Sequence, residues 1–257
     1  MSVTTFTSAI VRRPGRSVVS GLRAGDGDDP THEGVTAEHD AYIAALRAAG
    51  VSVMVLEPLE EFPDSIFVED PALVFDTGAV VLRPGAESRS GEAGAMRPVL
   101  NQHFETVLEL DSGFADGGDV LVTPNKVVIG LSARTDVAGA ENLIGLLTKL
   151  GRRGEVFRTP EGVLHFKSDC SLLNDETVLS TSLLAASGAF SEFKTILTPE
   201  GEEGAANALR VNDSLLVGAQ FPRTIELLSA KGYNVVPLPT EQIARIDAGL
   251  SCMSLRW

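Results

Sequence analysis

Residues 37–56, AEHDAYIAALRAAGVSVMVL, contain the pattern that decides the fold. Apolar and polar residues alternate at helical spacing over Ala37–Ala49, and Gly50 suits the left-handed end of a helix. The following run Val51–Leu56 is rich in β-branched residues, which are typical of a strand. The stretch therefore predicts an amphipathic helix, a stop and a strand.

The same helix-and-strand unit recurs four more times along the chain. In the third and fifth units Gly151 and Gly232 stand where Gly50 stands in the first, directly after a helical pattern. The four further units are predicted at Glu92–His103 with Thr106–Leu110, Asp136–Leu150 with Glu155–Arg158, Ser182–Phe190 with Lys194–Thr198, and Pro222–Lys231 with Tyr233–Leu238.

Each of the later helices is preceded by two strand-forming segments with a turn between them. Turn residues such as Asn174-Asp175 and Asn212-Asp213 separate the two segments, as expected of hairpins. The predicted hairpins are Ser65–Phe75 with Ala79–Arg83, Asp119–Val122 with Val127–Leu131, Leu172–Leu173 with Thr177–Ser180, and Ala208–Val211 with Ser214–Gly218.

The chain thus reads as five ββαβ modules. A repeated supersecondary unit favours closure into a ring around a pseudo-fivefold axis. We expect residues 1–257 to form one α/β-propeller domain, in which Ile243–Trp257 completes the first module and brings Cys252 to the centre. A doubly wound sheet is the alternative, but its single β-α alternation lacks the paired strands.

Composition limits the class of partner. The 257 residues are 44% hydrophobic and carry a formal charge of -14, which argues against nucleic acid or an anionic membrane surface. Such acidity favours a cationic small molecule, although surface carboxylates also serve solubility alone. Two cysteines form no disulfide framework, and no apolar run has the length of a membrane span or a signal peptide. We therefore expect a reduced, cytoplasmic setting.

Cys252 lies in the string GLSCMSL at residues 249–255. The Gly-Leu-Ser lead places the thiol where a turn meets a short apolar strand, a position that is fixed and yet reachable from a pocket. The alternative is a small buried hydrophobe, since free cysteine is among the most buried residue types. The choice depends on partners elsewhere in the chain.

His165, in LHFKS at residues 164–168, is predicted at the start of a strand in an apolar setting. A lone histidine in a strand is usually a core residue whose ring nitrogens are hydrogen-bonded. Together with a thiol and an acid from elsewhere in the chain, it could instead act in catalysis. The sequence has no His-x-x-x-His or Cys-x-x-Cys spacing, so it predicts no zinc site.

Two acidic strings are candidates for a site. In DSIFVEDP, residues 64–71, strand alternation would place Asp64 and Asp70 on one face and Glu69 on the other, with Pro71 able to turn Glu69 inward. In DGGD, residues 116–119, the paired glycines permit a close backbone approach beside Asp116. A solvated strand end and an ordinary turn are the respective alternatives. Neither string is a phosphate-binding loop.

Six motifs together resemble one known family. In chain order they are DSIFVEDP (64–71), LRPGAESR (82–89), DGGDVL (116–121), GLSART (130–135), LHFKS (164–168) and GLSC (249–252). They are similar to those of the dimethylarginine dimethylaminohydrolases, which are guanidino-modifying enzymes, and the resemblance covers essentially the whole chain. It implies the five-bladed α/β-propeller called the pentein fold, in agreement with the module count.

The resemblance also implies roles for individual residues. It assigns a nucleophile to Cys252, a general acid and base to His165 and an orienting acid to Asp116. Implied substrate contacts are Glu69 and Asp70 at the guanidinium, Asp64 and the Leu22 carbonyl at the α-amino group, Arg89 and Arg134 at the carboxylate, and the Ile246 backbone beside the nucleophile. One departure is Asp136, where the family pattern leads us to expect Asn. Cys170 matches no catalytic position.

The implied reaction is hydrolysis of dimethylarginine and monomethylarginine to citrulline and the corresponding amine. It passes through a covalent cysteine thiouronium and needs no metal or organic cofactor. Arginine deiminases and amidinotransferases share the chemistry but are longer. Arginine or citrulline as substrate, or a non-catalytic binding protein, remain alternatives. We further expect a monomer or homodimer, with the loop Arg23–Gly34 as a lid.

Overall fold

The structure is a computed structural model that describes residues 2–23 and 27–257. Part of the expected lid, residues 24–26, lies outside the described residues. The last residues of that expected loop are helical, because α1 begins at His32 with the Thr31 side chain accepting the backbone N–H of Gly34.

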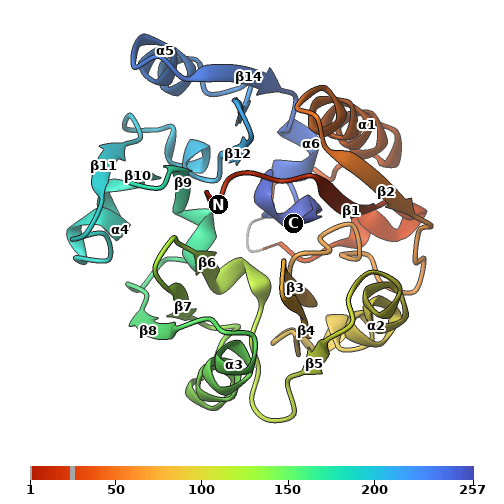
Figure 1. Ribbon diagram of the computed structural model, residues 1–257. Helices are drawn as coiled ribbons and strands as arrows, with labels where there is room; N and C mark the ends of the chain where they lie inside the picture. Colours follow the sequence, from red (N-terminus) through yellow and green to blue (C-terminus); the bar gives the residue numbers. More distant parts are fainter. Residues whose placement is uncertain (1, 24–26) are drawn as a thin grey trace.

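Five three-stranded sheets form the blades of a ring (Figure 1). The strands are β1 (Ser8–Arg12), β2 (Ser52–Leu56), β3 (Ala72–Phe75), β4 (Gly78–Val81), β5 (Val107–Glu109), β6 (Val120–Val122), β7 (Val127–Leu131), β8 (Gly154–Arg158), β9 (Cys170–Asn174), β10 (Thr177–Ser180), β11 (Lys194–Leu197), β12 (Leu209–Val211), β13 (Ser214–Gly218), β14 (Asn234–Leu238) and β15 (Leu255–Arg256). The predicted five-bladed α/β-propeller of ββαβ modules is confirmed.

Within the described ranges, five helices connect the middle and outer strands of their blades and lie on the outside of the ring, whereas the short helix Glu241–Ala244 connects the last blade to the first and lies nearer the centre (Figure 1). They are α1 (His32–Ala48), α2 (Glu92–His103), α3 (Val137–Lys149), α4 (Ser182–Ala186), α5 (Pro222–Ala230) and α6 (Glu241–Ala244); short 3₁₀ turns are η1 (Arg16–Ser20), η2 (Glu87–Arg89), η3 (Gly117–Asp119), η4 (Phe166–Ser168), η5 (Glu203–Ala206) and η6 (Ser251–Met253). The predicted stops are confirmed, since Gly50, Gly151 and Gly232 have φ of 87°, 72° and 87°.

Every blade has the same topology. The strand nearest the axis runs antiparallel to the middle strand, and the outer strand, which follows the helix, runs parallel to it. The first blade is built from both ends of the described chain, because Ala9 and Ile10 of β1 pair with Arg256 and Leu255 of β15. The predicted completion of the first module by Ile243–Trp257 is therefore confirmed, and it brings the Cys252 segment to the ring centre.

Helix α3 illustrates how the sequence produces a blade. Its buried residues Ala140, Leu143 and Leu147 recur at helical spacing and pack into the core between the second and third blades. Asp136 precedes the helix, and its Oδ1 accepts the Gly139 backbone N–H at 2.7 Å. A cap of this kind stabilises a helix by about 1 kcal/mol. The residue that departs from the family pattern is thus a helix cap.

Two strand predictions near the ring centre are wrong. The predicted strand Ser65–Phe75 is strand only over Ala72–Phe75, and the residues before it form buried turns. Their backbone bonds locally and to a distant segment: Phe67 N–H donates to the Asp64 carbonyl and Glu69 N–H donates to the Cys252 carbonyl. His165 does not start a strand but precedes the 3₁₀ turn Phe166–Ser168. Strand alternation therefore gives no guide to these side chains.

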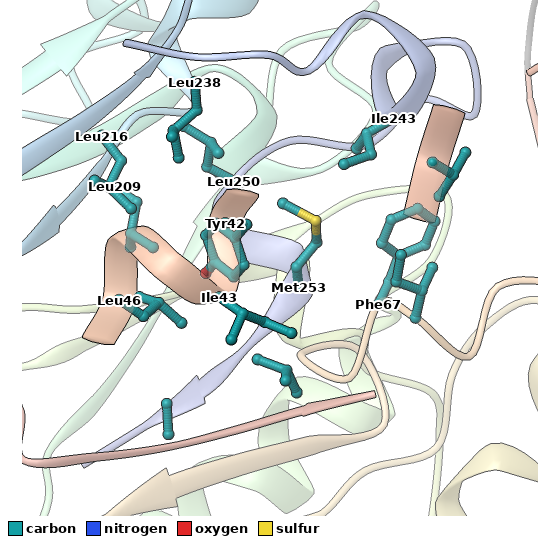
Figure 2. Close-up of a cluster of buried hydrophobic side chains, with 14 of the residues drawn as sticks. Tyr42, Ile43, Leu46, Phe67, Leu209, Leu216, Leu238, Ile243, Leu250 and Met253 are labelled. Atoms are coloured by element: carbon teal, nitrogen blue, oxygen red, sulfur yellow. The ribbon is translucent and has the colours of Figure 1, made fainter. Parts of the chain in front are cut away.

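The core beneath the Cys252 segment is the largest buried apolar cluster of the first blade. Tyr42, Ile43 and Leu46 of α1 pack there with Leu250 and Met253 from either side of the cysteine (Figure 2). No helix in the described ranges is long and apolar enough to cross a bilayer.

Candidate active site

Cys252 occupies the 3₁₀ turn Ser251–Met253, directly before β15. Met253 is fully buried against Tyr42 and its neighbours (Figure 2), and the hydroxyl of Tyr42 hydrogen-bonds Ser254 Oγ at 2.5 Å. These contacts on both sides fix the turn while the Cys252 side chain stays half-buried at a cavity. A thiol held in this way meets the expectation of a fixed and reachable group.

Asn207, which the sequence did not single out, links this turn to the His165 turn. Its Oδ1 accepts the Ser251 backbone N–H at 3.0 Å, and its Nδ2 donates to the Lys167 carbonyl at 3.0 Å. A Cβ at Gly249 would lie 2.4 Å from Asn207 Cγ, so only glycine permits this approach. A single buried asparagine carries no sequence pattern that reveals such a bridge.

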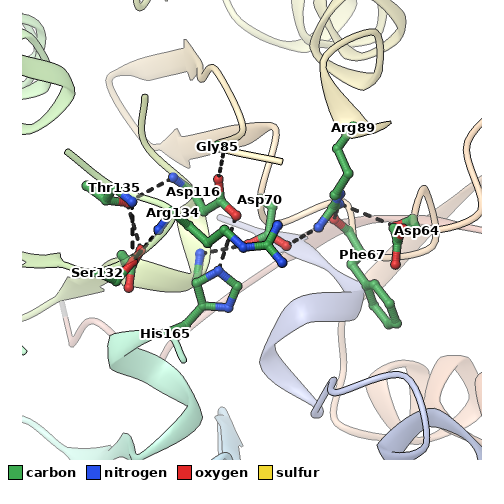
Figure 3. Close-up of polar contacts among 12 residues, drawn as sticks. Asp64, Phe67, Asp70, Gly85, Arg89, Asp116, Ser132, Arg134, Thr135 and His165 are labelled. Atoms are coloured by element: carbon green, nitrogen blue, oxygen red, sulfur yellow. Dashed lines mark hydrogen bonds and ion pairs between the residues drawn. The ribbon is translucent and has the colours of Figure 1, made fainter. Parts of the chain in front are cut away.

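His165 is held by a fully buried carboxylate. Its Nε2 lies 3.1 Å from Asp116 Oδ2, and Asp116 Oδ1 accepts the Gly85 backbone N–H at 2.7 Å (Figure 3). Burial disfavours the imidazolium, but the hydrogen bond to Asp116 and the negative charges of Asp70 and Asp119 outweigh it and raise the pKa of His165 to about 9. The imidazole is therefore protonated at neutral pH.

Asp119 fixes the surroundings of that pair. Its Oδ1 accepts the Phe166 N–H at 2.9 Å, and its Oδ2 accepts the hydroxyls of Ser132 and Thr135 at 2.6 and 2.7 Å. Thr135 Oγ1 in turn accepts the Asp116 backbone N–H at 3.1 Å. The string DGGD thus supplies one acid to His165 and another to the loops around it. The sequence flagged the string but gave no role to Asp119.

The paired glycines of that string permit the predicted close approach. A Cβ at Gly117 would lie 1.9 Å from the Glu69 carbonyl oxygen, and one at Gly118 would lie 3.1 Å from the His165 ring. The Gly118 N–H donates to Asp70 Oδ1 at 2.9 Å. Any side chain at Gly117 would separate the two acidic strings.

Arg89 is a buried counter-ion between the acids. It pairs with Asp70 through Nη1, and its Nη2 donates to the Phe67 carbonyl at 3.0 Å (Figure 3). It also pairs with Glu92 at 3.0 and 2.7 Å through Nε and Nη2. Most of its five N–H donors are therefore used within the protein. Burial favours protonation of Asp70, but Arg89 and His165 outweigh it and lower the pKa of Asp70.

Arg134 differs from Arg89. It is half-buried, its backbone N–H donates to Ser132 Oγ at 2.9 Å, and its guanidinium has no hydrogen-bonded partner among residues 2–23 and 27–257. Asp64 lies in the same region, and its Oδ1 accepts the Leu22 N–H at 3.0 Å. Burial raises the pKa of Asp64, although the Arg89 charge opposes the shift.

A cavity of about 140 Å³ joins most of these groups. Eight of the residues predicted for the site line it: Leu22, Asp64, Asp70, Arg89, Arg134, His165, Ile246 and Cys252. Asp116 lies behind His165 and does not line the cavity. Further lining residues are Arg23, Phe67, Leu164, Asp247 and Ala248.

Glu69 is not among the lining residues. It is buried, and its Oε1 accepts Lys167 Nζ at 2.6 Å and Arg256 Nη2 at 3.2 Å. It lines a second, larger cavity of about 460 Å³. The expected contact between Glu69 and a substrate guanidinium therefore has no geometric basis in this cavity, although its charge acts on Cys252.

The two thiols have different environments. Burial and the charges of Glu69 and Asp70 raise the pKa of Cys252 to about 11. Cys170 is fully buried, its Sγ lies 3.3 Å from the Phe166 carbonyl oxygen, and burial raises its pKa well above the ordinary value. Only Cys252 reaches the cavity.

One group of possible metal ligands coincides with the site. Donor atoms of Asp70, Asp116 and His165 lie within 4.8 Å of one another. All four carboxylate oxygens already accept protein donors, from Gly118, Arg89, Gly85 and His165. A cation would have to displace these donors, so the arrangement is that of a hydrogen-bonded acid and base set.

The chain is similar to several known proteins. A model of the family "N,N dimethylarginine dimethylhydrolase, eukaryotic" matches residues 24–148. The dimethylarginine dimethylaminohydrolase of Pseudomonas aeruginosa is 37% identical over 254 residues, which cover 98% of this chain and 100% of that protein. The chain belongs to the dimethylarginine dimethylaminohydrolase family. The enzyme of the same name from Streptomyces coelicolor is 34% identical over 251 residues, 96% of each chain.

Solved structures with the same fold include a member of this family and a more distant protein. The Pseudomonas aeruginosa enzyme, as a cysteine-to-serine mutant in complex with citrulline, matches with a TM-score of 0.95 at 37% identity, covering 98% of this chain and 100% of that one. The N-terminal domain of the cyanobacterial arginine dihydrolase ArgZ matches with a TM-score of 0.86 at 19% identity, covering 97% of this chain and 96% of that one. The latter likeness concerns the fold alone.

Proposed function

We propose that this chain hydrolyses N(G),N(G)-dimethyl-L-arginine and N(G)-monomethyl-L-arginine to L-citrulline and dimethylamine or methylamine. The observation that carries the proposal is one small cavity that brings together the Cys252 thiol, the Asp70 carboxylate and the His165 ring, which Asp116 holds from behind. Membership of the family supports the same reaction. We further infer that residues 1–257 act as one catalytic unit, since four of the five blades contribute to the site.

Binding of the substrate activates the nucleophile. The Cys252 thiol is protonated at neutral pH because burial and acidic neighbours raise its pKa to about 11. A guanidinium placed against Asp70 adds a positive charge beside the sulfur, which favours the thiolate and releases its proton to solvent. Nucleophile formation is thereby coupled to the presence of a cationic substrate.

The covalent step uses the proton on His165. The thiolate attacks the central guanidinium carbon, and the His165 imidazolium gives its proton to the departing alkylamine as the carbon–nitrogen bond breaks. A covalent thiouronium on Cys252 and a neutral imidazole remain. Asp116 holds the ring orientation and stabilises its charged form.

Water then resolves the intermediate. Neutral His165 removes a proton from a water molecule, and the resulting hydroxide adds to the thiouronium carbon. The carbon–sulfur bond then breaks as the added hydroxyl group gives up its proton to the sulfur, which leaves citrulline and the Cys252 thiol. The imidazolium is restored at the same time. All atoms come from the substrate, water and these two side chains.

The amino-acid end of the substrate is held at the other end of the cavity. Asp64 and the Leu22 carbonyl hold the α-ammonium group, the Ile246 backbone lies beside the nucleophile, and Arg134 holds the α-carboxylate. Arg89 contributes to binding of the α-carboxylate chiefly through its charge, because most of its N–H donors already bond to groups within the protein.

Replacing Arg134 with alanine is expected to weaken substrate capture by about 2–5 kcal/mol, because the substrate carboxylate then lacks its partner. The loss should appear in kcat/KM, with the free energy of unfolding nearly unchanged. Agmatine, which lacks the carboxylate, should be a poor substrate of the wild type and should lose little more in the variant. Efficient agmatine hydrolysis by the wild type would contradict the proposed binding of the substrate carboxylate by Arg134.

Arg89→Ala is the matched comparison. It leaves Asp70 and Glu92 buried without their counter-ion, so we expect urea denaturation to show a loss of about 3–5 kcal/mol. Equal stability of the two variants would show that Arg89 is not the internal counter-ion.

The nature of the leaving group tests the function itself. We expect kcat/KM to be higher for asymmetric dimethylarginine and monomethylarginine than for arginine or citrulline, because Phe67 and Leu164 supply apolar wall at the cavity. Two buried methyl groups supply only about 1–3 kcal/mol of discrimination, so arginine should react slowly. A higher kcat/KM for arginine or citrulline than for both methylated substrates would assign a different hydrolase activity. Absence of turnover with all four would leave the non-catalytic alternative.

A further inference from the structure

The larger cavity, of about 460 Å³, has no role in the proposed reaction. It is lined by residues of the axial strands β3, β6, β9, β12 and β15 and by residues 2–6, near the ring centre where both chain ends lie (Figure 1). Its volume is within the range of about 300–1,000 Å³ that small-molecule sites occupy.

Its charge is opposite to that of the protein. Four basic side chains line it (Arg152, Lys167, Arg210 and Arg256) against two acidic ones (Glu69 and Asp76), a net charge of +2. Arg152 is paired with Asp76, and Arg210 lies 4.0 Å from Asp213, so the excess positive charge is concentrated at Lys167 and Arg256. The whole chain carries -14. A cationic concavity in so acidic a protein focuses small anions and disfavours cations.

Unpartnered buried polar atoms gather at the same cavity. Arg256 Nε, Ser171 Oγ, Ser251 Oγ and Glu69 Oε2 have no hydrogen-bond partner among the described residues, and all four residues line it. Buried polar atoms are satisfied in almost every native protein, by solvent or by a ligand if not by the chain.

The floor of the cavity retains an excess positive charge. Glu69 pairs with both Lys167 and Arg256, at 2.6 and 3.2 Å, so one carboxylate faces two cations. The other Arg256 contacts are to the carbonyls of Ser251 and Ser254 and to the Ser254 hydroxyl, which are uncharged. The remaining wall is largely apolar and includes Leu172, Leu209 and Trp257.

We propose that this second cavity is a binding site for a small organic carboxylate with an apolar body. Its carboxylate would pair with the Lys167 and Arg256 side chains, which share one acidic partner, and its apolar part would lie against Leu172, Leu209 and Trp257. The site is separate from the catalytic cavity, since no residue lines both. The inference does not depend on the proposed reaction.

Trp257 makes the proposal testable, because it is the only tryptophan of the chain and lines this cavity. Cyclohexanecarboxylate is a suitable probe, since it has the apolar body and no absorbance at the excitation wavelength. We expect a saturable change in Trp257 fluorescence at constant ionic strength. The neutral cyclohexanecarboxamide and the cationic cyclohexylmethylamine should bind at least ten-fold more weakly. No saturable change, or an equal response to all three, would overturn the proposal.

Single-residue variants test whether the probe binds in this second cavity. Arg256→Gln and, separately, Arg210→Gln should raise the apparent Kd several-fold, and the second variant preserves the test if the first does not fold. Arg223→Gln is the matched control, because Arg223 lines neither cavity, and it should bind as the wild type does. Arg134→Ala and saturating citrulline should also leave the signal intact. Loss of the fluorescence change under either condition would show that the probe carboxylate binds in the catalytic cavity, and it would refute the second site.

Discussion

Replacing Cys252 with serine is expected to lower turnover of dimethylarginine by about 10⁴-fold or more, as removal of a covalent nucleophile does in other hydrolases. A serine hydroxyl is far less acidic than a thiol, so a bound guanidinium cannot convert it to an anion at neutral pH. The variant should still bind substrate, because the residues around the guanidinium and the amino-acid end are unchanged. Rapid quench followed by mass spectrometry should detect a thiouronium on the peptide that contains Cys252 in the wild type and none in the variant.

Cys170→Ser is the matched control. Cys170 is fully buried beneath the His165 turn, lines only the second cavity and has a pKa well above the ordinary value because of burial. We expect its replacement to keep kcat within a few-fold of the wild type. An adduct on Cys170, or full activity of Cys252→Ser, would refute the assignment of the nucleophile.

Replacing Asp116 with asparagine is expected to lower kcat by about 10²–10⁴-fold, the range in which general acid and base catalysis contributes. The hydrogen bond to Asp116 is the largest of the contributions that raise the pKa of His165 to about 9. In the wild type the imidazolium is thus present up to pH 9 and is lost above it. In the variant that loss should occur at lower pH, and a neutral amide partner also fails to stabilise the charged ring. Titration of the His165 ring by NMR measures the shift directly.

Asp136→Asn supplies the comparison for that experiment. Asp136 is exposed and caps α3, a role that asparagine fills equally well. This variant should keep both the His165 pKa and kcat of the wild type. An unchanged His165 pKa in Asp116→Asn would contradict the proposed source of the proton.

The sequence predicted those parts of the fold that are set by local interactions. Helix α2 has the predicted bounds, Glu92–His103, and the glycines after α1, α3 and α5 end those helices as expected. The prediction failed at residues 64–71, where the backbone is satisfied by a distant segment, as in the bond from Glu69 N–H to the Cys252 carbonyl. No periodicity within one segment reveals a partner so far away in the sequence.

The same limit applies to the site. Motif order identified which residues gather at the centre, and eight of them share one cavity. Motifs carry no information on which side of the axis a carboxylate faces, so Glu69 was expected beside Asp70 and lies instead with Lys167 and Arg256. Arg89 was expected to contact the substrate carboxylate together with Arg134, and most of its donors are bound to internal groups, chiefly Asp70 and Glu92. Asn207 had no motif at all, because its function depends on two turns that are adjacent only in three dimensions.

The closure of the first blade has a consequence for the order of folding. Every other blade forms from strands that are close in sequence, whereas the pairing of Ala9 with Arg256 joins segments from opposite ends of the described chain. Contacts of such long sequence separation carry the largest loop-closure entropy and are the slowest to form. Cys252 lies directly before β15, so an intermediate with four finished blades has the histidine and the acids but has not yet docked the segment that carries the thiol. Recovery of enzymatic activity during refolding therefore reports completion of the ring, whereas recovery of the helical circular-dichroism signal reports formation of the blades.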